Sequence, residues 1–187
     1  MLNTKNLWPL SGLLAATLLL AGCFNEAEQE AQTPKDQRIK LAMLQPPRSG
    51  LTPLSDDAFK LSRWSTAETL VVLDDKGEAQ PMLATAWEKV DETTWRFTLR
   101  ENVHFHDDSI LDTDTVVNAL SVAATASPKP RILDGVSLTV KADGNNAVLI
   151  STAQADPLLP QRLSSPQLAI LSRKAYQANG VVSPINA

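Results

Sequence analysis

WRFTLRENVHFHDD, residues 95–108, contains the clearest two-residue period in the chain. Its first half alternates three apolar side chains, Trp95, Phe97 and Leu99, with polar or charged ones. Successive side chains of a β-strand point to opposite faces, so this pattern predicts a half-buried strand over 94–100. The neighbouring elements are assigned outward from this strand.

Turn-forming residues predict two β-hairpins. An Asp-Glu-Thr turn separates 86–90 from the strand at 94–100, which predicts the first hairpin. An Asp-Gly-Asn-Asn turn joins 136–142 to 147–152, because glycine and asparagine tolerate the positive φ of a tight turn. Alternation of apolar and basic residues predicts a further strand at 38–43.

One helix is well signalled after these strands. Asp112 is a good N-cap, apolar residues follow it at helical spacing, and Ser-Pro at 127–128 ends the pattern. Two weaker helices are expected at 57–70 and 157–178, the second interrupted at Ser165-Pro166. With strands outnumbering helices, the sequence predicts an α/β fold of the mixed α+β kind.

The composition is that of an ordinary globular protein, with 187 residues, 43% hydrophobic and 20% charged residues, and a formal net charge of −4. These values argue against a disordered chain and against a polytopic membrane protein. The acidic balance argues against nucleic-acid binding, which needs a basic face. The single cysteine excludes an intramolecular disulfide and a cysteine-rich zinc site.

The N-terminal residues have the pattern of a secretory signal. Residues 10–20 are apolar or small and follow a weakly positive start, but a bilayer-spanning helix needs about 20 apolar residues. The Leu-Ala-Gly-Cys sequence that ends at Cys23 resembles the lipobox of bacterial lipoproteins. The resemblance implies a lipoprotein signal peptide at 1–22 and lipidation of Cys23. The alternative is a buried structural cysteine.

A polar segment separates Cys23 from the predicted fold. Residues 25–37 contain no large apolar side chain and cannot contribute to a core. We therefore expect 23–37 to be a lipid-anchored flexible tether and 38–187 to be the folded part.

Both histidines of the chain lie in the 95–108 segment. On an extended backbone, His104 and His106 share one face, whereas Val103 and Phe105 share the other. Two imidazoles beside an Asp-Asp pair are capable of binding a metal ion. The alternative is a solvated strand face, which we favour because no third donor of distinctive spacing is nearby. No metal site is therefore expected.

No motif indicates catalysis. The chain lacks a Gly-x-Ser-x-Gly nucleophile elbow, and the glycines after Cys23 are too isolated for a phosphate-binding loop. The pairs Asp56-Asp57 and Asp74-Asp75 are interpreted as turn residues on solvated faces rather than as an acid–base pair. We expect neither an enzyme nor a cofactor.

Three tryptophans of the predicted fold are candidates for packing or ligand contact. Trp95 lies on the apolar face of its strand and Trp87 is similar, so both are expected in the core. Trp64 lies in a polar Ser-Arg-Trp-Ser stretch and either packs or faces a cleft.

Seven motifs follow one another in a fixed order. They are Leu51-Thr52-Pro53, 68–71 (ETLV) before a short hairpin that contains Gly77, 81–87 (PMLATAW), 95–108, the acidic helix start at 112–120, Ala155-Asp156-Pro157 and 171–176. As an ordered set they resemble the N-terminal lobe of the extracytoplasmic solute-binding proteins of ABC importers, in the peptide/nickel class (family 5). Each motif alone is weak.

The resemblance implies the N-terminal lobe of a two-lobed periplasmic-binding-protein type II fold. Asn102 and Asp108 stand where the family usually has glycine, and both residue types tolerate the left-handed conformation, so the turns are expected to be kept. The family continues with a Gly-Thr-Gly-Pro segment and a second lobe, which implies that the lobe is truncated here. Ligands of the family lie between two lobes that close on them.

The resemblance implies an extracytoplasmic, periplasmic protein that delivers an oligopeptide or dipeptide to an ABC permease in the inner membrane, anchored through Cys23. A nickel or metal-chelate binding protein of the same family is the first alternative. A non-functional truncated product and a small envelope lipoprotein that contacts other proteins are the others. The residues expected to contact ligand are Gln45, Arg48, Asp56 and Trp64.

Overall fold

The computed structural model describes residues 42–177 and 182–184. The chain divides into two units, and the fold described below belongs to the second, Gln45–Ala187. The predicted signal peptide, Cys23, the tether and most of the strand at 38–43 lie outside the described residues. Residues 42 and 43, the described end of that strand, are not in a strand.

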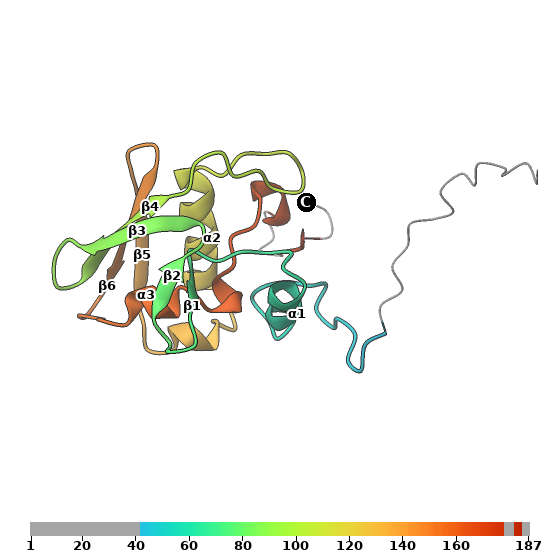
Figure 1. Ribbon diagram of the computed structural model, residues 1–187. Coiled ribbons are helices and arrows are strands. Elements are labelled where there is room, and N and C mark those ends of the chain that lie inside the picture. The colour runs from blue at the N-terminus through green and yellow to red at the C-terminus, as the bar shows by residue number, and fades with distance from the viewer. Residues whose placement is uncertain (1–41, 178–181, 185–187) are drawn as a thin grey trace, which may run out of the picture. The chain divides into compact units, whose positions relative to one another are not determined.

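Short strands and helices alternate along the second unit (Figure 1). In chain order they are α1 (Ala58–Arg63), β1 (Val71–Leu73), β2 (Ala79–Pro81), β3 (Ala84–Lys89), β4 (Thr94–Leu99), α2 (Thr113–Thr125), η1 (Arg131–Leu133), β5 (Leu138–Asp143), β6 (Ala147–Thr152), α3 (Leu159–Arg162), η2 (Pro166–Leu168) and η3 (Arg173–Ala175). The three η elements are single turns of 3₁₀ helix. This element content confirms a mixed α+β fold.

The main sheet is antiparallel, with the strand order β3-β4-β6-β5. Both predicted hairpins are confirmed, as β3-β4 and β5-β6, and β4 joins them by pairing with β6. In this register Trp87, Phe97 and Val148 lie directly opposite one another and share the face that meets the core. A separate two-stranded sheet contains β1 and β2.

The other face of the sheet is polar. Arg96 on β4 lies 2.6 Å from a carboxylate oxygen of Asp143 and 4.0 Å from one of Glu88. Thr94 and Ser151 hydrogen-bond across the β4-β6 pair through their hydroxyl groups, at 3.0 Å. The two-residue period seen in the sequence therefore separates an apolar from a polar face, as predicted.

The predicted helix after Asp112 is confirmed as α2. Asp112 Oδ1 accepts the backbone N–H of Thr115 at 2.7 Å, which is the expected N-cap bond. The buried side of the helix contains Val116 and Leu120, and it packs against β5 and β6 (Figure 1).

The two weaker helix predictions were too long. Only α1 forms within 57–70, because the chain reverses at Ser65, which has a positive φ of 53°. Within 157–178 only α3 and the turns η2 and η3 form. Pro166 lacks a backbone donor and begins the single turn η2. The chain is extended from Ala169, and the N–H of Ile170 bonds to the carbonyl of Glu68 at 2.9 Å.

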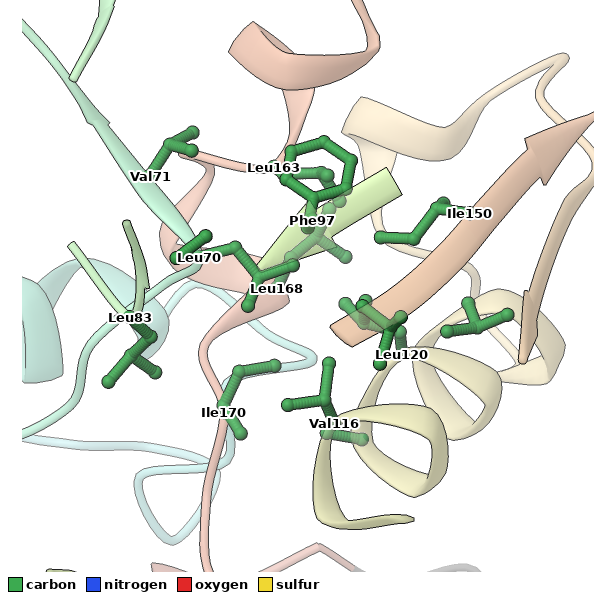
Figure 2. Close-up of a cluster of buried hydrophobic side chains, with 14 of the residues drawn as sticks. Leu70, Val71, Leu83, Phe97, Val116, Leu120, Ile150, Leu163, Leu168 and Ile170 are labelled. Atoms are coloured by element: carbon green, nitrogen blue, oxygen red, sulfur yellow. The ribbon is translucent and has the colours of Figure 1, made fainter. Parts of the chain in front are cut away.

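One cluster of buried apolar side chains fills the space between the sheet, α2 and the C-terminal turns (Figure 2). Phe97 is fully buried in it and stacks on Trp87 with a ring-centroid distance of 6.2 Å. Trp87 and Trp95 pack against the cluster, as predicted, although both are only partly buried.

Candidate functional site

A cavity of about 520 Å³ lies beside the core of the second unit. Three segments supply most of its walls, 64–68, 103–107 and 170–172, and the walls are largely apolar. Leu83 and Ile170 belong both to the cavity lining and to the core cluster, in which Figure 2 labels them. The volume is typical of a site for a small ligand.

Unusual backbone conformations concentrate around this cavity. Leu51 and Ser65 have positive φ values, 60° and 53°, and both line it. The other two described non-glycine residues with positive φ, Asn102 and Asp108, flank the 103–107 wall at 56° and 64°. The sequence prediction that these two adopt the left-handed conformation is confirmed. Such conformations cost free energy and cluster at functional sites.

The 103–107 wall separates its side chains as predicted. Val103 and Phe105 pack against the core, whereas His104 and His106 are exposed. All four line the cavity. His106 Nε2 lies 3.2 Å from the carbonyl oxygen of Thr66, and because a carbonyl only accepts, Nε2 carries a proton and donates it to this bond.

Two ion pairs lie at the cavity. Arg100 Nη2 is 2.8 Å from Glu68 Oε2, and Lys174 Nζ is 3.0 Å from Asp107 Oδ2. Hydrogen bonds from Ser109, the nearby Lys174 ammonium and the Ser172 hydroxyl hold the pKa of Asp107 well below its usual range despite the opposing effect of desolvation. Asp107 is therefore ionised at neutral pH.

Ser172 places a polar atom on an otherwise apolar wall. Its residue is 4% exposed and lines the cavity close to Asp107. Its Oγ is beside the Asp107 carboxylate and helps to lower the pKa of that group, although the geometry is not that of a well-formed hydrogen bond. A hydroxyl that donates to a carboxylate keeps its own acceptor capacity for a ligand group.

A buried carboxylate shapes the loop that carries Leu51. Asp57 is 2% exposed, and its Oδ2 accepts the backbone N–H groups of Ser49 at 2.7 Å and Arg48 at 3.0 Å. Its Oδ1 lies 2.9 Å from Lys60 Nζ. Burial would raise the pKa of Asp57, but these partners outweigh it and hold the pKa well below the usual range. The interpretation of Asp57 as a solvated turn residue was wrong.

Of the four residues predicted to contact ligand, Trp64 alone lines the cavity. Gln45, Arg48 and Asp56 are exposed and stand outside the lining. Sequence reasoning missed Glu68, Arg100 and Ser172, which come together only through the fold. The buried Asp57 carboxylate was missed as well, although its spacing of three residues from Lys60 favours an ion pair on a helix turn.

Within 42–177 and 182–184, no group of three or more His, Cys, Asp or Glu side chains is arranged to hold a metal ion. Over the same part of the chain, no helix combines the length and apolarity needed to cross a membrane.

Residues 78–185, more than half of the chain, match the family described as "Bacterial extracellular solute-binding proteins, family 5 Middle". The chain belongs to this family. The match confirms the family resemblance inferred from the ordered motifs, and family 5 is a family of solute-binding proteins rather than of enzymes.

Individual relatives of this family-5 chain match shorter parts of it. It is 32% identical over 101 residues to the HTH-type transcriptional regulator SgrR of Escherichia coli K12, which covers 54% of this chain and 17% of SgrR. A nickel ABC transporter structure from Bacillus halodurans superposes with a TM-score of 0.55 and 25% identity, covering 65% of this chain and 26% of that one. The pheromone receptor PrgZ superposes with a TM-score of 0.59 and 19% identity, covering 74% and 33%.

The chain thus spans less than a fifth of the curated relative and between a quarter and a third of these two solved structures. The solved neighbours are two-lobed periplasmic binding proteins, which confirms the predicted fold class.

Proposed function

We propose that this family-5 chain is part of the solute-binding component of an ABC importer that delivers an oligopeptide or dipeptide to a membrane permease. The observation that carries the proposal is the apolar cavity with Trp64 on its wall. An apolar cavity of about 520 Å³ next to the polar groups of Ser172 and Glu68 suits part of a peptide, because a peptide combines apolar side chains with a polar main chain.

Trp64 provides the test. Peptide titration of the full chain is expected to change its tryptophan fluorescence saturably, because Trp64 is the one described tryptophan that lines the cavity. Trp64→Phe should remove most of this change and weaken binding about fivefold, the effect of losing roughly 1 kcal/mol of aromatic contact.

Trp87→Phe is the matched control, since it removes an indole that packs against the core outside the cavity. This variant should leave unchanged both the size of the fluorescence change and the affinity for the peptide. Loss of the signal in Trp87→Phe with retention in Trp64→Phe, or no binding of any peptide, would contradict the proposal.

A metal chelate is the second candidate ligand. His104 and His106 line the same cavity, and the Bacillus halodurans neighbour is a nickel transporter. A nickel–histidine chelate belongs in the same titration. Saturable binding of this chelate without binding of any peptide would replace the peptide as the proposed ligand.

We also propose that Cys23 carries a lipid that anchors the protein to a membrane of the cell envelope, outside the cytoplasm. The lipobox-like sequence before Cys23 supports this. Cys23→Ala is expected to move the protein from the membrane fraction to the soluble fraction, and mass spectrometry should find a diacylglyceryl group on the wild-type cysteine. An unmodified Cys23 in membrane-bound protein would contradict the proposal.

A further inference from the structure

The full charges on the cavity wall are already neutralised. Glu68 pairs with Arg100 at 2.8 Å and Asp107 pairs with Lys174 at 3.0 Å. Among the lining residues that the structure describes, no carboxylate or guanidinium lacks a partner of opposite charge. Both side chains of the Glu68–Arg100 pair are 43% exposed, so water screens this pair. A charged ligand side chain would therefore find no unpaired charge of opposite sign at this wall and would have to compete with an existing partner.

The remaining wall suits an apolar side chain. Trp64, Phe105 and Leu61 present aromatic and aliphatic surface from two separate segments, and the floor continues into the core through Leu83 and Ile170. Transfer of an apolar side chain from water to such a site is favourable in proportion to the area buried. An apolar wall of this kind favours an apolar over a charged side chain.

Ser172 supplies the polar contact that a peptide needs. Its buried hydroxyl is beside the Asp107 carboxylate, which only accepts, so the hydroxyl hydrogen is directed there and the oxygen can still accept. A peptide group next to an apolar side chain offers an N–H to that oxygen. This contact does not depend on which side chain the ligand carries.

We propose that the cavity selects an uncharged apolar residue of a peptide, because Glu68 and Arg100 cancel each other, and that Ser172 binds the adjoining main chain. This inference rests on the proposed peptide-binding function. It assigns a selectivity role to an ion pair: each partner prevents the other from attracting a charged side chain.

The test is calorimetric titration of the full chain with Ala-Phe-Ala, Ala-Glu-Ala and Ala-Lys-Ala. The wild type is expected to bind the phenylalanine peptide at least about tenfold more tightly than either charged peptide. Arg100→Ala releases the Glu68 carboxylate and should improve binding of the lysine peptide about tenfold relative to the phenylalanine peptide. Glu68→Ala releases Arg100 and should do the same for the glutamate peptide.

Two further variants serve as controls for the Arg100→Ala and Glu68→Ala substitutions. Arg96→Ala breaks the ion pair with Asp143 on the polar face of the sheet, away from the cavity lining, and should leave the preference unchanged. Ser172→Ala should weaken all three peptides by a similar factor. Thermal melts of each variant, monitored by circular dichroism, establish that it is folded before its binding is compared.

The outcomes separate this inference from the proposed function. Equal affinity for the three peptides, or equal preference in Arg96→Ala and Arg100→Ala, overturns the selectivity role while peptide binding stands. Absence of binding for every peptide tested overturns the proposed function and the inference with it.

Discussion

Phe97→Ala is expected to lower the free energy of unfolding by about 4 kcal/mol, the usual range for deleting a buried aromatic ring. Phe97 lies within the buried cluster (Figure 2) and is fully buried. It belongs to β4, an inner strand of the main sheet, and stacks on Trp87. The substitution removes apolar burial and leaves a cavity that the rigid sheet cannot close. Urea unfolding followed by circular dichroism measures the loss.

Phe59→Ala is the matched control, because Phe59 on α1 is 56% exposed. Its effect should stay within about 0.5 kcal/mol, as for surface substitutions in general. Equal losses for the two variants would mean that Phe97 does not lie at the centre of the core.

Asp57→Ala is expected to lower the free energy of unfolding by about 3 kcal/mol. The change leaves the backbone N–H groups of Arg48 and Ser49 without their acceptor and Lys60 without its counter-charge. The loop they hold carries Leu51, so ligand binding in the cavity should weaken as well.

Asp56→Ala is the control for this variant. Asp56 is the preceding residue, carries the same side chain and is exposed, so its replacement should change the free energy of unfolding by no more than about 0.5 kcal/mol. A larger effect of Asp56→Ala than of Asp57→Ala would contradict the assignment of the buried carboxylate.

The contribution of Asp57 to the free energy of unfolding should decrease at acid pH. Its pKa is lowered in the folded state, so the unfolded chain binds the proton first as the pH falls. The stabilisation is fully present above the unfolded carboxyl pKa, about 3.9, and is lost as the pH falls through the lower folded value. The difference in unfolding free energy between wild type and Asp57→Ala should therefore be constant near neutral pH and shrink below about pH 4.

Sequence patterns correctly predicted the strands, hairpins and helix start that depend on neighbouring residues. The alternation over 94–100 gave β4, a turn of glycine and asparagine gave the β5-β6 hairpin, and Asp112 gave the start of α2. The helices predicted at 57–70 and 157–178 were too long, because bonds to distant partners such as Glu68–Ile170 hold parts of them extended. Helical spacing alone contains no information about those partners.

The candidate site was predictable only in part. Trp64 and the two faces of 103–107 followed from the sequence, since they depend on residue type and backbone alternation. The Glu68–Arg100 pair joins residues 32 positions apart, and the exposure of Asp56 against the burial of Asp57 depends on how one loop closes.

The sequence by itself determined the four strands of the main sheet, their two hairpins, the capped helix and the family, because each rests on neighbouring residues or on motifs in fixed order. Only the tertiary structure decided which charges cancel and where the apolar cavity lies. Its walls come from segments more than 100 residues apart, 64–68 and 170–172, which only the folded chain brings together.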